Sequence, residues 1–216
     1  MSHEVLLFSE LETADIPRGV ICLGDSKGTF ADEPIAKLFK VGNQGGIRWI
    51  GSAEAPLLVA LVSNQKHEDW PDEIDERTGV VRYYGDNRTS VDDLHKPPGN
   101  QLLCNLFRRG FSTMKDRMLA PPFFVFTAPT EPGLPGRSHR FRGLAVPGAP
   151  TVQPEDWLVA RWFDSPDGRF QNYVLTLQLL DVPLVPRAWI DELGAGDVLG
   201  RACPIAYRQW VEHGHI

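Results

Sequence analysis

The stretch PLLVALV at residues 56–62 decides the fold class. A continuous apolar run of this length is typical of a strand that is buried on both faces. Working outward, a polar and acidic loop follows at 63–77, and GVVRYY at 79–84 is expected to form the returning strand. Two further apolar segments, at 123–127 and 140–146, extend the pattern. A sheet is therefore expected at the centre of the protein.

Short helices and a hairpin complete the predicted elements. Residues 34–39, 100–118 and 186–193 have the spacing of helices, and 157–163 and 170–180 read as two strands around a turn. The chain of 216 residues contains 20 glycines and 18 prolines, which helices tolerate poorly. We therefore predict a single α+β domain with a large sheet and a few short helices.

Several classes of protein are excluded by what the sequence lacks. No apolar run approaches the roughly 20 residues of a membrane span, and the first residues do not form a signal peptide. We therefore expect a cytoplasmic protein without a membrane partner. The three cysteines, Cys22, Cys104 and Cys203, are far apart, so we expect free thiols rather than disulfides or a zinc site.

The sequence contains no recognisable catalytic motif. It has neither a phosphate-binding glycine loop nor a Gly-x-Ser-x-Gly elbow, and its six histidines are scattered. We expect no cofactor, no metal and no catalytic residue in this chain. One alternative stays open, namely a nuclease or base-modifying hydrolase that uses the carboxylates at 68–76.

The charge distribution points to an anionic partner although the net charge is −6. Residues 81–150 carry ten basic and five acidic side chains, whereas both flanking regions are acidic. Of the 22 cationic residues, 16 are arginines, whose planar fork suits phosphates and base edges. The middle of the chain is therefore the expected nucleic-acid-binding part.

Aromatic and hydrogen-bonding side chains gather around the acidic loop. Trp70 lies in the polar stretch EDWPDE, where an indole has no obvious place in a core. The next strand ends in RYYGDNR at 82–88, and because neighbouring strand residues point to opposite faces, one of Tyr83 and Tyr84 should face a pocket while the other packs. Aromatic walls beside a carboxylate such as Asp86 suit a flat heterocycle that is stacked on its faces and read along its edge.

Four segments carry a resemblance to a known family: VGNQGGIR at 41–48, VRYYGDNR at 81–88, GNQLL at 99–103 and RFQNY at 169–173. Together they resemble the N-terminal recognition domain of AspBHI-type modification-dependent restriction endonucleases. That domain is similar to the SRA fold, which holds a flipped 5-methylcytosine. This fold is a curved, half-open β-barrel of the SRA/PUA-like type. The resemblance implies the same fold here.

The resemblance also implies roles for individual residues. Tyr83 matches the strand tyrosine that stacks on the flipped base, and Trp70 matches the loop aromatic on the other face. Asp72 or Glu73 matches the carboxylate that accepts a hydrogen bond from cytosine N4. We favour Asp72, because a proline precedes it and its side chain is shorter, and Asp86 is the next candidate. The expected base pocket is Trp70, Asp72, Glu73, Tyr83, Tyr84 and Asp86.

The implied function is binding of double-stranded DNA that contains a modified cytosine, without cleavage by this chain. We expect a recognition domain over 1–200 and a linker over 201–216 that leads to a C-terminal nuclease domain. An RNA- or single-strand-binding interaction module is the other alternative, and self-association is left open. The expected contacts to DNA outside the pocket are Arg48, Arg82, Asn87, Arg88, Asn100, Arg108, Arg109, Lys115 and Arg117.

Overall fold

The centre of the protein is a ten-stranded, mostly antiparallel sheet. The computed structural model describes residues 4–25, 28–63, 71–89, 93–166 and 168–214. The main path of the sheet runs, in spatial order, through β4 (Ile47–Gly51), β5 (Pro56–Ser63), β8 (Phe123–Thr127), β9 (His139–Pro147), β11 (Phe170–Leu179), β7 (Val80–Tyr84) and β6 (Glu73–Ile74).

Shorter strands are attached to this path. The predicted hairpin is confirmed, since β10 (Leu158–Phe163) pairs antiparallel with β11. On the other side, β3 (Ile21–Cys22) pairs with β9 and also with β1 (Val5–Leu6). A separate two-stranded sheet joins β12 (Leu184–Val185) to β2 (Ile16–Pro17).

The strand predicted from residues 56–62 is buried on both faces, as expected. Leu58 and Ala60 of β5 belong to one hydrophobic cluster, whereas Val59 and Leu61 belong to a second cluster on the opposite face. Its parallel neighbour β8 alternates in the same way. These two strands therefore separate two cores, and a run without polar residues is what that position requires.

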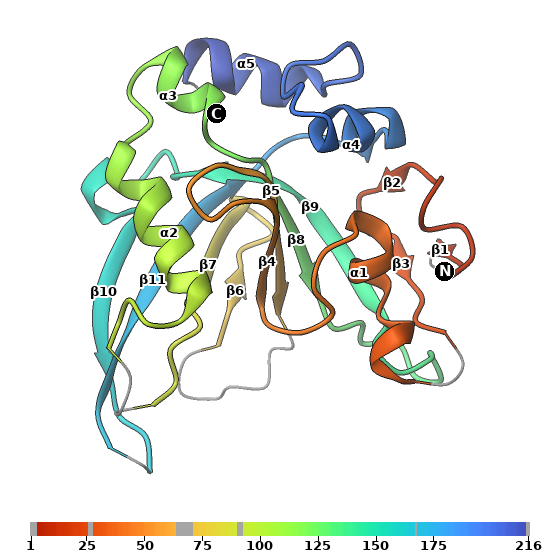
Figure 1. Cartoon of the computed structure of the whole chain (residues 1–216), viewed down its shortest axis with the longest axis horizontal. Coiled ribbons are helices and arrows are strands. Elements are labelled where there is room, and N and C mark those ends of the chain that lie inside the picture. The colour runs from red at the N-terminus through yellow and green to blue at the C-terminus, as the bar shows by residue number, and fades with distance from the viewer. Residues whose placement is uncertain (1–3, 26–27, 64–70, 90–92, 167, 215–216) are drawn as a thin grey trace.

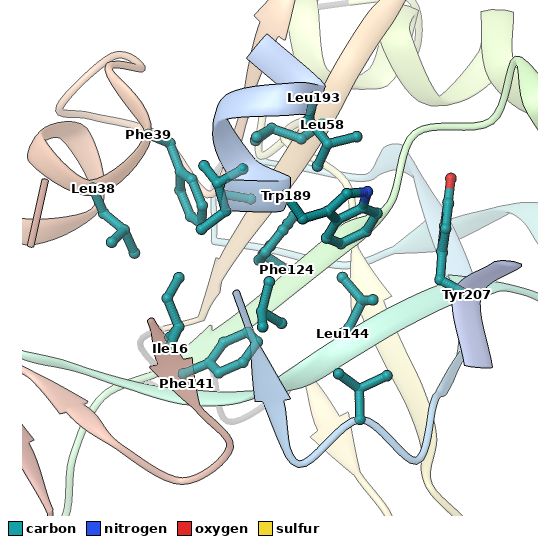
Figure 2. Packing of buried hydrophobic residues seen from close by; sticks show 14 of the residues in the cluster. Ile16, Leu38, Phe39, Leu58, Phe124, Phe141, Leu144, Trp189, Leu193 and Tyr207 are labelled. Carbon is teal, nitrogen blue, oxygen red and sulfur yellow. The ribbon is translucent and has the colours of Figure 1, made fainter. Parts of the chain in front are cut away.

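The larger core is covered by three helices (Figure 2). They are α1 (Pro34–Phe39), α4 (Arg187–Gly194) and α5 (Ile205–His213). Trp189 and Tyr207 are completely buried here, and the Tyr207 hydroxyl donates to the carbonyl oxygen of Ala120 at 2.8 Å. The residues expected to form a linker, 201–216, thus include a helix that packs into the core. That they lead to an effector domain stays a prediction.

The smaller core lies under α2 (Pro98–Arg109), which crosses in front of the left half of the sheet in Figure 1. The single helix predicted over 100–118 is wrong, because α3 (Met114–Met118) is a separate helix. Gly110 ends α2 with a φ of 72°, and Thr113 starts α3 with a capping box to Asp116. Both are local stop and start signals that the apolar spacing had masked.

The sheet curves but does not close. Its path ends at β4 on one side and at β6 on the other, and these two strands do not pair within the described residues. Two single 3₁₀ turns, Phe30–Asp32 and Pro154–Asp156, complete the secondary structure. The prediction of an α+β fold with a half-open, curved sheet and short helices is confirmed.

Candidate functional site

A polar cavity of about 560 Å³ opens at the end of β7, and it is the candidate site. Asp72 and the pair Tyr83–Tyr84 line it from the β6–β7 side, and Asp86 and Arg88 line it from the segment that follows β7. The other walls come from distant parts of the chain. They are Glu33 at the start of α1, Gly46 and Arg48 at β4, and Arg137 and His139 at β9.

Both tyrosines line this cavity, although they lie on opposite faces of β7. Tyr83 is 3% exposed, and its hydroxyl donates to the carbonyl oxygen of Val62 at 3.3 Å. Gly46 lies directly against it, because a Cβ at that position would collide with the Tyr83 hydroxyl. Tyr84 packs edge-on against Phe163, with ring centroids 5.6 Å apart. Tyr84 lies on the same face of β7 as Arg82 and lines a second cavity together with Arg82 and Phe163, so the expectation that one tyrosine faces the pocket while the other packs stays a prediction.

Two carboxylates face the tyrosines. Asp72 accepts a hydrogen bond from the backbone N–H of Tyr84 at 2.9 Å. Burial raises the pKa of Asp86 to about 6, although Arg88 acts in the opposite direction. Burial, together with Asp72 and Asp86, raises the pKa of Tyr83 well above its usual value, so its hydroxyl stays a neutral donor.

The other acidic candidate lies elsewhere. Glu73 does not line the cavity; its side chain is 59% exposed and lies 3.9 Å from Arg82 in an ion pair. The geometry therefore favours Asp72 over Glu73. Trp70 lies outside the described residues, so its place beside the cavity stays a prediction.

A cluster of buried amides holds the segment from Gly85 to Arg88 in place. Asn100 is completely buried, accepts from the backbone N–H of Asp86 at 2.8 Å and donates to the carbonyl oxygen of Leu94. Asn172 donates to the carbonyl oxygen of Gly85, where any Cβ would collide with both amides. Asn87 is 1% exposed and donates to the carbonyl oxygen of Gln171.

The structure therefore contradicts the expected DNA contacts of Asn87 and Asn100. Their side-chain amides form hydrogen bonds with backbone groups, as buried polar side chains generally do. The backbone of Gly85 is approached closely, as a glycine permits. The groups that approach it are the side-chain amides of Asn100 and Asn172.

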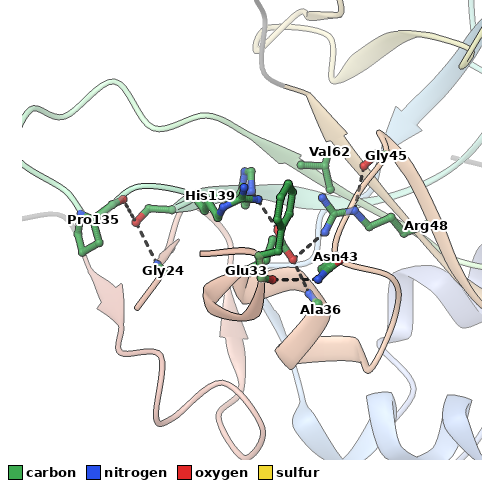
Figure 3. Close-up of polar contacts among 12 residues, drawn as sticks. Gly24, Glu33, Ala36, Asn43, Gly45, Arg48, Val62, Pro135 and His139 are labelled. Carbon is green, nitrogen blue, oxygen red and sulfur yellow. Dashed lines mark hydrogen bonds and ion pairs between the residues drawn. The ribbon is translucent and has the colours of Figure 1, made fainter. Parts of the chain in front are cut away.

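The inner wall of the cavity carries a network of buried charges (Figure 3). Glu33 is 1% exposed and forms an ion pair with Arg48, with Oε2 2.7 Å from Nη1. Its other oxygen lies 3.1 Å from Nε2 of His139. Arg48 also donates from Nε to the carbonyl oxygen of Gly45 at 2.9 Å. Arg48, expected among the outer DNA contacts, is thus 7% exposed and lies inside the pocket.

The remaining basic candidates are spread over the surface. Arg88 is exposed at the cavity, and Arg82 is exposed on the opposite face of β7, where it lines a second cavity of about 500 Å³. Arg108 and Arg109 are exposed at the far end of α2, about 14 Å along the helix axis from Gly99. Lys115 is exposed on α3.

Arg117 is not a surface cation. It is 6% exposed, and its guanidinium donates to four backbone carbonyls, those of Phe111, Ser112, Val211 and Glu212. It joins α3 to the end of α5, so the expectation that it contacts phosphate is wrong. Nothing in the sequence separates this arginine from its neighbours, since its carbonyl partners are set by the fold.

Reasoning from the sequence missed several residues of the cavity, among them Glu33, Gly46, Arg137 and His139. The pair Gly45–Gly46 was visible in the segment 41–48, but its contact with Tyr83 was not. Glu33 and His139 meet only because β9 and the start of α1 are brought together by the fold. Within the described part of the chain, no group of three or more potential ligands could hold a metal ion, and no helix could span a membrane.

Solved structures with this architecture are known. The chain is 37% identical to the DNA modification-dependent restriction endonuclease AspBHI, with a TM-score of 0.86 over 98% of this chain and 54% of that one. It is 33% identical to the DNA recognition domain of the cytosine modification-dependent restriction endonuclease LpnPI, with a TM-score of 0.87 over 100% of this chain and 95% of that one. The MspJI restriction endonuclease in complex with a 27-mer oligonucleotide matches 72% of this chain and 37% of that one, at 28% identity and a TM-score of 0.59.

These matches define the class of the protein. The chain corresponds to the DNA recognition domain, and not to the catalytic domain, of modification-dependent restriction endonucleases. It belongs to the family described as restriction endonuclease AspBHI N-terminal, whose model matches residues 21–216. The chain spans about half the length of AspBHI. A search of curated proteins gave no match.

Proposed function

We propose that this chain binds double-stranded DNA containing a modified cytosine and flips that base into the cavity at the end of β7. The observation that carries this proposal is the combination in one cavity of aromatic walls, Tyr83 and Tyr84, with two carboxylates, Asp72 and Asp86. A flat base can stack on such walls while its edge is read by hydrogen bonds. Two relatives, a DNA modification-dependent endonuclease and a cytosine modification-dependent one, support the choice of ligand.

The carboxylates select cytosine over thymine. Cytosine presents its N4 amino group as a donor where thymine presents the O4 acceptor. An ionised carboxylate accepts from the amino group and repels a carbonyl oxygen. Because both cytosine and thymine can carry a methyl group at C5, this edge must supply the distinction between the two bases.

The energy balance requires a tight pocket. Extruding a base from the duplex costs a few kcal/mol, which stacking and edge contacts must offset. Tyr83 cannot move away without losing its bond to Val62, and the amide cluster fixes the segment that carries Asp86. The pocket is therefore organised before DNA arrives, which lowers the cost of binding.

Contacts to the phosphates supply the part of the affinity that does not depend on sequence. Arg88 lies exposed at the cavity, where the backbone of a flipped nucleotide must pass. Arg82, Arg108, Arg109 and Lys115 are exposed and can add contacts further along the duplex. In the whole protein, we propose, this domain supplies the specificity of an endonuclease whose catalytic domain lies C-terminal to it.

The decisive experiment compares one duplex with and without 5-methylcytosine at a single position. Affinity is measured at physiological salt in several flanking contexts, with the corresponding single strand as a competitor. We expect the modified duplex to bind about fourfold or more tightly than the plain one, since the two bases share the same hydrogen-bonding edge and burying the added methyl group contributes about 0.8 kcal/mol. Equal affinities in every context would refute the proposal. Stronger binding of the single strand would favour a single-strand-binding module instead.

A further inference from the structure

We propose that Arg48 reads the acceptor edge of the flipped base by donating two parallel hydrogen bonds to N3 and O2 of cytosine. This inference rests on the proposed function and adds a second reader to the carboxylates. Arg48 lies on β4 and lines the same cavity as Asp72, which lies just before β6 on a different wall.

The guanidinium is held at two points. Nε donates to the carbonyl oxygen of Gly45 at 2.9 Å, and Nη1 lies 2.7 Å from the Glu33 carboxylate (Figure 3). Two anchors of this kind fix both the position and the plane of the group. The Arg48 guanidinium is therefore fixed in its donor geometry before a ligand binds.

Most of the hydrogen-bonding capacity of this group is unused. A guanidinium has five N–H donors, and it stays charged when it is buried. Within the described residues, Gly45 and Glu33 are the partners of Arg48, whose side chain is 7% exposed. Buried donors without partners are rare in folded proteins, and a bound ligand that brings acceptors would satisfy them. The Nδ1 atom of His139, on the same wall, is likewise buried without a partner among the described residues.

The chemistry of the missing acceptors follows from the burial. Glu33 already balances the charge of Arg48, and taking a second anion such as phosphate out of water is costly, so neutral acceptors suit a group that is 7% exposed. A flipped cytosine brings two adjacent acceptors, N3 and O2, into the pocket beside its N4 donor. Their spacing matches the fork of an arginine, as in other bidentate contacts.

Arg48 and the carboxylates then both select cytosine, the carboxylates through its N4 amino group and Arg48 through N3 and O2. Thymine carries a hydrogen at N3, and this N3–H group would face the donors of Arg48. The cavity therefore rejects thymine at two atoms, O4 and N3. Glu33 acts as a positioning residue: burial alone would raise its pKa, but the hydrogen bond with His139 and the charge of Arg48 outweigh it and lower the pKa.

The test uses three duplexes whose target nucleotide lies opposite an abasic site, so that the loss of base pairing does not affect affinity. The targets are 5-methylcytosine, 5-methyl-3-deazacytosine, which lacks the N3 acceptor, and 5-methyl-2-pyrimidinone, which lacks the N4 amino group. We expect the wild-type domain to bind each analogue about tenfold or more weakly than 5-methylcytosine. Binding of the deaza analogue as tightly as 5-methylcytosine would overturn the inference.

The variant is the double substitution Glu33→Gln/Arg48→Met, because removing Arg48 alone leaves a buried carboxylate without its cation. We expect it to bind 5-methylcytosine more weakly and to lose the distinction against the deaza analogue, while it still rejects the pyrimidinone. Arg169→Met, at an arginine that is 63% exposed and outside this cavity, is the matched control and should keep both distinctions.

Two outcomes separate this inference from the proposed function. If the folded double variant keeps the full wild-type distinction against the deaza analogue, Arg48 is structural and the inference is wrong, although the base pocket stands. If the wild-type domain does not distinguish 5-methylcytosine from cytosine, the proposed function itself fails. Should the double variant not fold, the wild-type comparison and Arg48→Lys, which keeps the charge but not the fork, decide the question.

Discussion

The Asp72 carboxylate accepts a hydrogen bond from the backbone N–H of Tyr84, with Oδ1 2.9 Å from the nitrogen. This bond ties the residue just before β6 to the last residue of β7, so that a candidate base reader and an aromatic wall are held together. Asp72 thus has a structural part that an amide can replace and a charge that an amide cannot replace.

Asp72→Asn separates these two parts. The asparagine can still accept from Tyr84, so we expect the domain to fold normally. Its side chain can also donate, so the preference for modified cytosine over thymine should shrink by about 1–3 kcal/mol in competition binding. Glu73→Gln is the matched control, since Glu73 is 59% exposed and outside the cavity. If both variants keep full preference, this acidic segment does not supply the reader, and Asp86 becomes the candidate.

Binding should depend on pH through Asp86, whose pKa burial raises to about 6. If Asp86 accepts a hydrogen bond from the base, it must be ionised, so affinity should fall as the pH decreases through 6. Titration of affinity between pH 5 and 8 measures this effect. Asp86→Asn should flatten the profile over that range, and an unchanged profile would show that another group titrates.

The same carboxyl should lower the stability of the folded domain at neutral pH. Its pKa in the folded protein lies above its ordinary value, so the native state binds more protons than the unfolded state between about pH 4 and 6. Stability contributed by this group is therefore lost as the pH rises through that window. Urea unfolding at pH 7.5 should show Asp86→Asn to be more stable than wild type, by up to about 3 kcal/mol, with a smaller difference at pH 4.5.

Asn100→Ala tests whether this residue holds the segment that carries Asp86 in place. The substitution leaves the backbone N–H of Asp86 and the carbonyl oxygen of Leu94 without their partner. We expect unfolding free energy to fall by about 1–3 kcal/mol, and affinity for the modified duplex to fall with it. Asn105→Ala, on the same helix but partly exposed, should have little effect. A stable Asn100→Ala variant with a flatter salt dependence would instead restore its role as a phosphate contact.

Gly46→Ala should damage the pocket while leaving the fold intact. The added Cβ would collide with the Tyr83 hydroxyl and disturb its bond to Val62. We expect affinity for the modified duplex to drop by about tenfold, with a loss of stability no larger than about 1–3 kcal/mol. Gly42→Ala, in the same loop and with open space around it, is the control. Equal binding by both variants would mean that the Tyr83 hydroxyl can shift without consequence.

The salt dependence of binding should identify the phosphate contacts. Arg88→Ala should weaken binding to modified and plain duplexes alike and reduce the slope of log affinity against log salt by about one unit. The double variant Arg108→Ala/Arg109→Ala tests the far end of α2 in the same assay. An unchanged slope there would make these two residues surface charge only.

The elements of the fold were predictable because their signals are local. The apolar run at 56–62 and the paired segments around 164–168 each specify a strand or a hairpin within a few residues. The break between α2 and α3 was missed because apolar residues continue past Gly110, at Phe111, Met114 and Met118. Of the cavity, the part within 72–88 was visible from the sequence, since aromatic residues, acids and a glycine stand together there.

The rest of the cavity depends on contacts between distant segments. Nothing near Glu33 indicates that it will meet Arg48 and His139, since those contacts arise only when the sheet forms, with β4 paired to β5 and β9 paired to β8. The same reason explains the errors at Asn87, Asn100 and Arg117. Their side chains are typical of nucleic-acid contacts, but in the folded protein their partners are backbone groups.

The walls of the cavity come from five separated stretches of the chain, at 33, at 45–48, at 62, at 72–88 and at 137–139. No single loop therefore contains the reading surface, and a peptide or grafted hairpin carrying 82–88 would not transfer it to another scaffold. Engineering a new base preference requires coordinated changes on several strands. Exchange between enzymes should succeed only when the complete domain is moved as one cassette.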